Sequence, residues 1–406
     1  MVSSTMQAGS ENATRDTATR DDATRDDATR EVADLPSLCV QAHAANLMVL
    51  HDGTLACVWF GGSMEGRSDI SVYMSRLEAG SGQWTEPVQL SADPERSEQN
   101  PILFPAPDGS LWLLHTAQVS GNQDTSIVRR RISRDNGRSW GPTETLQDAA
   151  PGTFVRHPIH VHSDGSWLLP IFHCRTRPGE KWDGSFDDSG VMRSTDQGTS
   201  WQHIAVPHSV GCVHMSIVPA ANDRLLGFFR SRWADFIYAT RSDDGGITWS
   251  KPVATVLPNN NSSIQALRLA DGRLAMIFNA SSAADATERR ASLYDELEDG
   301  AAPAAGTAAE TSQAPARRAF WGAPRAPMTL ALSADDGLTW PWQRNLEVGD
   351  GWCLSNDSAR GLNREYSYPS LRQSEDGALH VAYTVFRKHI RHVRVTPEWI
   401  SQSSNG

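Results

Sequence analysis

Apolar and polar positions alternate in short stretches along most of the chain, and an Asp-Gly pair interrupts many of them. The segments LMVLHDGTLACVWF (47–60), LFPAPDGSLWLLHT (103–116) and IHVHSDGSWLLPIF (159–172) follow this pattern. Alternation with a period of two predicts β-strands, and Asp-Gly between two such runs predicts a hairpin turn. The glycines of these three turns are spaced 56 residues apart, which indicates a regular repeat. The signal returns at Asp271-Gly272 and Asp376-Gly377, with a weaker version at Asn222-Asp223.

A second motif, Ser-x-Asp-x-Gly-x-x-Trp, occurs four times. Its copies are SRDNGRSW (133–140), STDQGTSW (194–201), SDDGGITW (242–249) and SADDGLTW (333–340). We expect the Asp side chain to accept hydrogen bonds from the backbone of its own turn, the Gly to adopt a positive φ and the Trp to pack underneath. The motif therefore predicts a self-capped turn in each repeat unit.

The two motifs together predict the fold. Each unit has the pattern strand, Asp-Gly turn, strand, third strand, Asp-bearing turn and final strand, which is typical of a propeller blade rather than a helical solenoid. The Asp-Gly signals indicate six blades. We predict an all-β fold over residues 35–400, a six-bladed β-propeller with four-stranded antiparallel blades. A stretch rich in Ala, Glu and Pro at about 281–318 is expected to be a surface insertion, and residues near Leu38 to Val40 are expected to complete the last blade.

Residues 1–34 have a different composition from the rest of the chain. They repeat Ala-Thr-Arg-Asp with alternating charge and contain almost nothing apolar. Such a segment cannot offset the entropy lost on ordering, so we predict a disordered tail. A short solvated helix is the alternative.

Charge and composition exclude some classes of binding partner. The formal net charge of −11 disfavours nucleic acid or an anionic membrane as the main partner, because both require a clustered basic surface. The five cysteines are scattered without a CxxC pair, and no ligand spacing implies a metal or another cofactor. No apolar run is long enough to span a bilayer, and no signal peptide is recognisable, so we expect a soluble monomer and favour the cytoplasm.

The Ser-x-Asp-x-Gly-x-x-Trp turns resemble the Asp-box of the sialidase (neuraminidase) superfamily of BNR-repeat propellers, and the resemblance extends over about residues 38–397. Asp-boxes lie on the periphery of a propeller, so they indicate the fold rather than the reaction. The resemblance implies a site on the central face with three arginines for the substrate carboxylate, a Tyr nucleophile assisted by Glu, and an Asp acid/base. A neutral phenol suits this chemistry, because a carboxylate nucleophile would be repelled by the carboxylate of the sugar.

Five residues match that pattern. YPSL resembles the nucleophile strand and implies Tyr368, with Tyr366 as a fallback; a buried core tyrosine is the structural alternative. RLLGFFRSR implies Arg230 as the second arginine, and RAPMTLALS implies Arg325 as the third, against an alternative of rim arginines. WFGGSMEGRSDI implies Asp69 as acid/base with Glu65 as a second carboxylate, although an Asp that starts a strand is also common.

Two positions depart from the family. QAHAANLMVL places His43 where the family has its first arginine, and His214 stands where the family has Glu. A histidine with a pKa near neutrality is able to deprotonate Tyr368, so we expect His214 to act as the base and His43 to help bind substrate. Asn100 and Arg156, on predicted inner strands, are expected to complete the pocket.

These expectations lead to three hypotheses. The first is a sialidase-like exo-glycosidase that removes a terminal acidic sugar from a glycan through Tyr368 and Asp69. The second takes the histidines as proton-transfer groups and predicts a His/Tyr-dependent lyase or glycosidase acting on a polysaccharide that contains uronic acid. The third is a glycan-binding propeller without turnover, which the missing arginine would also allow.

Overall fold

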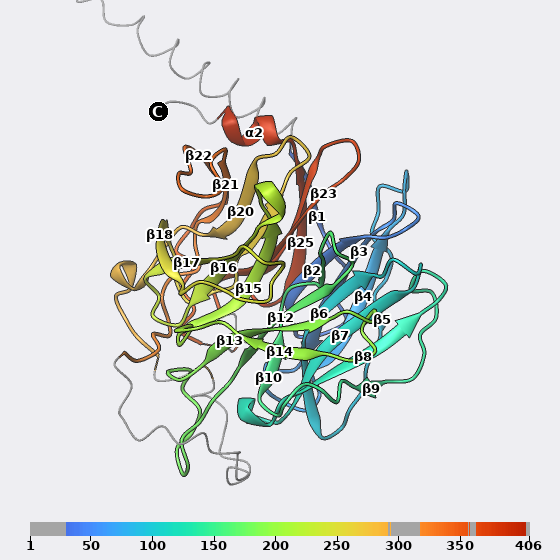
Figure 1. Cartoon of the computed structure of the whole chain (residues 1–406), viewed down its shortest axis with the longest axis horizontal. Helices are drawn as coiled ribbons and strands as arrows, with labels where there is room; N and C mark the ends of the chain where they lie inside the picture. Colours follow the sequence, from blue (N-terminus) through green and yellow to red (C-terminus); the bar gives the residue numbers. More distant parts are fainter. Residues whose placement is uncertain (1–29, 291–292, 294–316, 356, 358–362, 403–406) are drawn as a thin grey trace, which may run out of the picture.

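The computed structural model describes residues 30–290, 293, 317–355, 357 and 363–402. Six antiparallel sheets are arranged around a central axis, which confirms the predicted six-bladed β-propeller (Figure 1). Blade 1 contains β2 (Gln41–Val49), β3 (Leu55–Gly62), β4 (Ser71–Leu77) and β5 (Val88–Gln89). Blade 2 contains β6 (Arg96–Pro105), β7 (Leu111–Val119), β8 (Ile127–Ser133) and β9 (Glu144–Thr145). Blade 3 contains β10 (Thr153–Val155), β11 (His160–Val161), β12 (Trp167–His173), β13 (Asp188–Ser194) and β14 (Gln202–Ala205).

The second half of the ring repeats the arrangement. Blade 4 contains β15 (Cys212–Pro219), β16 (Leu225–Ser231), β17 (Phe236–Ser242) and β18 (Val253–Pro258). Blade 5 contains β19 (Gln265–Arg268), β20 (Leu274–Asn279), β21 (Met328–Ser333) and β22 (Trp342–Glu347). Blade 6 contains β23 (Tyr366–Gln373), β24 (Leu379–Val385), β25 (His389–Val395) and β1 (Glu31–Asp34). Short helices are η1 (Gln123–Thr125), η2 (Ala221–Asp223), η3 (Ala283–Asp285) and α2 (Pro397–Ser401).

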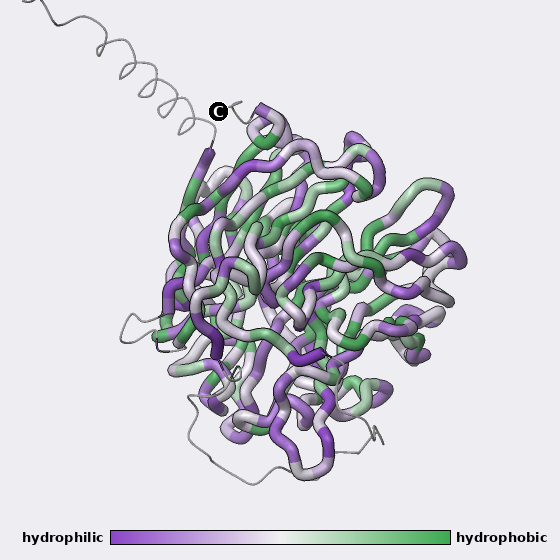
Figure 2. Tube along the Cα trace, turned by 90° about the vertical axis from the view of Figure 1, so that its left-hand side faces the viewer, coloured by the Kyte–Doolittle hydropathy of each residue, from purple (hydrophilic) through white to green (hydrophobic). Residues whose placement is uncertain are grey.

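The hydrophobic core is divided among the contacts between neighbouring blades. One cluster joins Leu330 and Leu332 of blade 5 to Leu371 and Val381 of blade 6, and comparable clusters join the other neighbouring pairs. In Figure 2, hydrophobic stretches lie mostly in the interior of the tube and hydrophilic stretches are frequent in the loops at the periphery. A strand that is covered on both faces has apolar residues in nearly continuous runs. This explains why apolar and polar residues alternate less regularly in the inner strands than in the outer strands.

The ring closes through an N-terminal strand rather than through the segment that the sequence suggested. Strand β1 pairs antiparallel with β25, from Glu31 opposite Arg394 to Asp34 opposite Arg391. The expectation that residues near Leu38 to Val40 complete blade 6 is therefore wrong, and residues 31–34, which were predicted to belong to a disordered tail, form a strand. The sequence does not predict this strand, because its side chains are mostly exposed and only Ala33 is partly buried. Apolar and polar residues therefore do not alternate along it.

The repeated turns have the predicted geometry. In SDDGGITW, the Asp244 carboxylate accepts from Thr248 N at 2.8 Å, Ser242 Oγ accepts from Gly246 N at 2.8 Å, and Gly246 has a φ of 82°. Trp249 packs in the core between blades 3 and 4. Each turn is thus a local unit that satisfies its own backbone.

Two further predictions concern the N-terminal tail and the internal insertion. Most of the tail (1–29) and most of the insertion predicted at about 281–318 lie outside the described residues. Within the described residues, no helix has the length and hydropathy needed to cross a membrane.

Candidate active site

Four inner strands share a distortion that aims side chains toward the axis. Strands β2, β6, β15 and β23 each shift register against their partner, and each carries a residue with positive φ inside the shift. An extra residue in a strand redirects the side chains around it, and a non-glycine residue in this backbone region is uncommon outside functional or strongly constrained positions. The four residues, with their φ values, are Ala44 (60°), Asn100 (50°), His214 (56°) and Tyr368 (51°).

Tyr368 lies at the centre of this ring of distorted strands, surrounded by arginines. Arg230 Nη1 donates to Tyr368 Oη at 2.5 Å, and Arg230 Nε donates to Asn261 Oδ1 at 2.8 Å. The guanidinium carbons of Arg156, Arg230 and Arg325 lie 5.3, 5.5 and 5.7 Å from the centroid of the tyrosine ring. The structure thus places three of the predicted site residues, Tyr368, Arg230 and Arg325, close together.

These cations change the acidity of the phenol. Burial alone raises the pKa of Tyr368, but the positive charges of Arg230, Arg325 and Arg232 outweigh it, so the pKa is lowered from its usual value of 10.0. A nearby opposite charge favours the ionised form of a titratable group. Tyr368 is therefore easier to deprotonate than an ordinary tyrosine, although no carboxylate base touches its hydroxyl among the residues described.

Arg325 belongs to a buried chain of ion pairs. Its Nη1 lies 2.8 Å from Glu365 Oε2, and Glu365 Oε1 lies 2.6 Å from Arg387 Nε. Arg387 Nη1 also pairs with Glu65. Two arginines and two carboxylates balance in this chain, and all four side chains are at most 5 % exposed. Arg325 is thus neutralised within the protein, whereas Arg230 makes no ion pair with a carboxylate of the described chain.

The sequence patterns did not reveal Arg387, Glu365, Arg232 or Asp187. Arg387 and Glu365 belong to the ion-pair chain, and Arg232 binds Asp187 at 2.6 Å. A signal existed for Arg387, which directly follows the apolar run LHVAYTVF and, like the preceding Phe386, has a positive φ. A charged residue at the end of a buried strand requires a partner, and its partners came from segments far away in the chain.

The two histidines flank the tyrosine ring. The ring centroid of His43 lies 4.3 Å and that of His214 5.5 Å from the centroid of Tyr368. Nδ1 of His43 lies 2.9 Å from Thr384 Oγ1, and Nδ1 of His214 lies 3.1 Å from Ser263 Oγ. Burial, followed by the charges of nearby arginines, holds both pKa values well below 6.5. The expected near-neutral pKa of His214 is therefore wrong, because a buried imidazole beside Arg230 resists protonation.

Arg156 has a different place from the one expected of a substrate ligand. Its Nη2 donates to the backbone oxygens of Ala45, Tyr368 and Pro369 at 3.1, 3.1 and 3.2 Å, and its Nε donates to Ser263 Oγ at 3.1 Å. These bonds connect the segment after β10 of blade 3 to blade 1, to the distorted backbone of Tyr368 in blade 6, and to Ser263 just before blade 5. Arg156 thus holds the backbone of Tyr368 in place and uses these donors on the protein rather than on a ligand.

The remaining predicted residues lie around this centre. Both carboxylate oxygens of Asp69 accept hydrogen bonds from Ser63, at 3.0 Å each, and the side chain is exposed. The next residue, Ile70, packs in one cluster with Tyr368, so the Asp69 loop borders the site. Glu65 is buried and paired with Arg387 rather than free to meet a ligand. Asn100 is 5 % exposed within the distortion of β6.

Aromatic side chains cover the arginines. The Trp321 ring lies 5.9 Å from the guanidinium of Arg230 and 5.2 Å from that of Arg232, and Tyr368 itself is only 7 % exposed. Tyr366, by contrast, packs against Phe386 and Tyr383, with ring centroids 5.4 and 6.4 Å apart. The register shift therefore separates two tyrosines that simple alternation would place on the same face.

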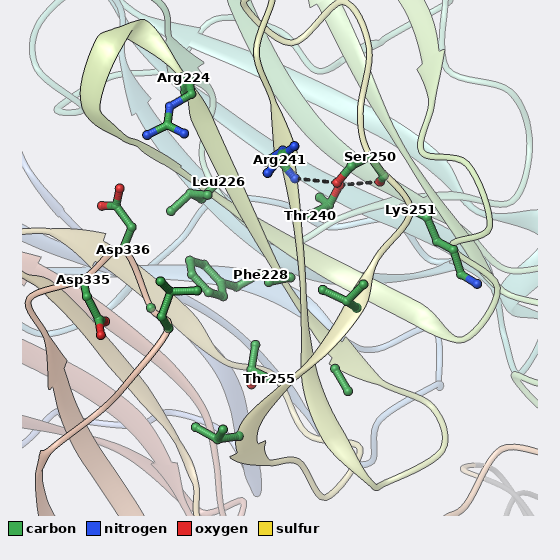
Figure 3. Close-up of a pocket in the computed structure, with 16 residues that line it drawn as sticks. Arg224, Leu226, Phe228, Thr240, Arg241, Ser250, Lys251, Thr255, Asp335 and Asp336 are labelled. Atoms are coloured by element: carbon green, nitrogen blue, oxygen red, sulfur yellow. Dashed lines mark hydrogen bonds between the residues drawn. The ribbon is translucent and has the colours of Figure 1, made fainter.

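A groove of about 800 Å³ lies elsewhere, on the rim between blades 4 and 5 (Figure 3). The figure shows Arg224, Arg241 and Lys251 around it, with Asp335 and Asp336 on the facing blade. Its lining contains none of the candidate site residues. Among the residues that the structure describes, no group of three or more His, Cys, Asp or Glu side chains is placed to hold a metal ion.

Comparison with known proteins places this geometry in context. A family model described as BNR repeat-like domain matches residues 53–381. The fold is similar to that of Hadza microbial sialidase Hz136, with a TM-score of 0.64 at 15 % identity over 89 % of this chain and 67 % of the other. The intramolecular trans-sialidase from Ruminococcus gnavus, solved with oseltamivir carboxylate, gives a TM-score of 0.63 at 12 % identity over 89 % of this chain and 96 % of the other.

A protein of unknown function from Dyadobacter fermentans gives a TM-score of 0.63 at 15 % identity, over 90 % of this chain and 97 % of its own. Among proteins with curated descriptions, none matches the sequence. At such identities the likeness concerns the fold, and the chemistry has to be argued from the residues around Tyr368.

Proposed function

Since the chain belongs to the BNR repeat-like domain family, with the propeller fold of sialidases, we propose that it is a sialidase-like exo-glycosidase. Its substrate is a glycan that ends in an acidic sugar, sialic acid or a related keto-acid sugar. The observation that carries the proposal is the 2.5 Å contact from Arg230 Nη1 to Tyr368 Oη, at a phenol whose pKa the arginines lower.

In the proposed reaction, Tyr368 first loses its Oη proton to solvent, and the phenolate oxygen then attacks the anomeric carbon while the glycosidic C–O bond breaks. The Asp69 carboxyl gives its proton to the departing oxygen, and a covalent glycosyl–tyrosine intermediate remains. Water then attacks the same carbon, Asp69 takes the proton of that water, and the Tyr368 oxygen leaves. Atoms and charge balance, and the two steps need no cofactor.

Arg230 has the properties required to bind the sugar carboxylate. It is buried, it makes no ion pair with a described carboxylate, and its guanidinium faces the phenol. A planar guanidinium matches a carboxylate in two parallel hydrogen bonds. Because Tyr368 is 7 % exposed and Trp321 lies over Arg230, sugar entry requires movement of the covering side chains.

One observation favours a second reaction. His43 Nε2 is buried without a hydrogen-bond partner in the described chain, and the His43 ring lies 4.3 Å from that of Tyr368. On a uronate, His43 Nε2 would remove the proton next to the carboxylate while Tyr368 protonates the oxygen that leaves from the neighbouring carbon. The product would be an unsaturated uronate, whereas the first reaction releases a saturated keto sugar.

Product analysis tests the proposal. The protein is incubated with fluorogenic sialosides, related keto-acid glycosides and uronate disaccharides, and each reaction is repeated with Tyr368→Phe and with Tyr366→Phe as the matched control. We expect release of a saturated acidic sugar by the wild type and by Tyr366→Phe, and at least about a 1000-fold loss in Tyr368→Phe. Ultraviolet-absorbing unsaturated product would favour the elimination, and binding without any product would contradict both reactions.

A further inference from the structure

A second cavity lies on the axis, at the end of the inner strands away from Tyr368. The inner strands begin beside the candidate site and run to the Asp-Gly turns, so their last residues surround the other end of the axis. There a cavity of about 280 Å³ lies between β11, β15, β19 and β23, and we call it the axial cavity. Arg372, four residues after Tyr368 on β23, lies roughly 13 Å further along that strand.

The axial cavity has an unbalanced positive charge. Its lining contains Arg268 and Arg372 but no Asp or Glu. Arg268 is neutralised by Asp336, at 2.6 Å. Arg372 donates from Nη1 to the Leu371 carbonyl oxygen at 2.8 Å and makes no ion pair within the described chain. Arg372 is partly buried, and a cation in such a place without a counter-charge is costly, a cost that a bound anion offsets.

The charged neighbours of Arg372 are repulsive rather than compensating. The positive charge of Arg372 contributes to lowering the pKa values of Arg156 and His157, after burial. No opposite charge acts on Arg372 itself, and burial lowers its pKa to about 10, so it remains protonated at neutral pH. The guanidinium is thus a permanent cation that lines a largely apolar cavity.

Two histidines, His157 and His160, also line the axial cavity. His157 is 3 % exposed, and its ring lies beside the carbonyls of Ile264 and His214 without a hydrogen bond of ordinary geometry. Burial lowers the pKa of His160 to about 4, so this ring is neutral at pH 7. A neutral imidazole still carries one N–H, which an anion is able to accept.

We propose that the axial cavity binds a small oxyanion, a phosphate-like ion or a simple carboxylate, through the Arg372 guanidinium with His157 and His160 at its sides. The volume of about 280 Å³ accommodates such an ion with a few waters, each of which occupies roughly 30 Å³ of liquid volume. The site is separate from Tyr368 and Arg230 and does not depend on the proposed glycosidase reaction.

Calorimetric titration with inorganic phosphate and with acetate, at constant ionic strength, tests the proposal. We expect one site per chain in the wild type, at least about tenfold weaker binding in Arg372→Met, and unchanged binding in Arg134→Met, which removes an exposed arginine. Arg230→Met should also keep the site. Binding of phosphate but not acetate identifies a tetrahedral oxyanion, and the reverse identifies a carboxylate.

Three results would overturn the proposal: no binding to the wild type, equal binding in Arg372→Met, or loss of the site in Arg230→Met, which would assign the anion to the candidate active site. If Arg372→Met does not fold, the wild type still decides the matter. Crystals soaked in selenate should then show its anomalous signal within hydrogen-bond distance of Arg372, and a signal elsewhere would refute the assignment.

Discussion

Arg230 and Tyr368 are 138 positions apart in the chain, yet a guanidinium nitrogen of one lies 2.5 Å from the phenol oxygen of the other. Arg230 ends the apolar run of β16 in blade 4, and Tyr368 lies in the distorted first strand of blade 6. The contact therefore exists only because the ring of blades closes. It also determines the acidity of the tyrosine on which the proposed chemistry depends.

The acidity of Tyr368 is directly measurable. Burial raises the pKa values of Tyr73, Tyr238, Tyr366 and Tyr383, whereas arginines lower that of Tyr368. We expect a tyrosinate absorbance step below pH 10 that disappears in Tyr368→Phe and moves to higher pH in Arg230→Met. Tyr366→Phe is the control and should keep the step.

The same shift has a consequence for stability. Because the pKa of Tyr368 is lower in the folded state than in the unfolded state, the folded state releases its proton first as the pH rises. The free energy of unfolding should therefore rise with pH between the folded-state pKa of Tyr368 and about pH 10. This contribution disappears when the pH falls through the folded-state pKa. Chemical denaturation across this pH range should show the rise in the wild type and not in Tyr368→Phe. Equal slopes of unfolding free energy against pH in the two proteins would contradict the prediction.

Neighbouring aspartates in SDDGGITW provide a test of the self-capped turn. Asp244 accepts hydrogen bonds from Thr248 N at 2.8 Å and Thr248 Oγ1 at 2.5 Å, whereas Asp243 makes only a long, exposed ion pair with Arg241 at 3.6 Å. Asp244→Ala should lower the free energy of unfolding by about 1–2 kcal/mol. Asp243→Ala should change it by less than about 0.5 kcal/mol. Urea denaturation of both variants decides the point, and equal effects would count against the turn geometry.

The closing strand predicts an asymmetry between two truncations. A chain that starts at Arg30 keeps β1 on β25, whereas a chain that starts at Leu35 exposes the edge of β25 and removes the Asp34 to Arg391 ion pair. The shorter chain should melt about 5 °C or more below the longer one and aggregate more readily, because an open strand edge pairs with other chains. Equal melting temperatures would show that blade 6 does not need β1.

The sequence allowed the fold to be predicted because its signals are local. Each Asp-Gly turn and each Ser-x-Asp-x-Gly-x-x-Trp turn satisfies its hydrogen bonds within a few residues, so the residues themselves report the geometry. The closing strand Glu31–Asp34 has no such signal, since it pairs with residues more than 350 positions away and shows no apolar alternation.

The site was only partly predictable for the same reason. The sequence resemblance pointed to Tyr368, Arg230 and Arg325, and the structure brings them together. It gave no sign of the register shift that turns Tyr366 away, because a non-glycine residue with positive φ has no local marker. Nor could it show that Arg325 is neutralised by Glu365, since that pairing depends on distant blades meeting at the axis.

The most direct test of the central claim is to trap the tyrosine during turnover. A fluorinated glycosyl fluoride of the sugar that the protein releases should slow the second step of the reaction and leave the sugar bound to the enzyme, for detection by peptide mass spectrometry. The account predicts a sugar adduct on Tyr368 in the wild type, none in Tyr368→Phe, and an unchanged adduct in Tyr366→Phe. Turnover of the substrate with an adduct on another residue, or with no adduct and an unsaturated product, would contradict it.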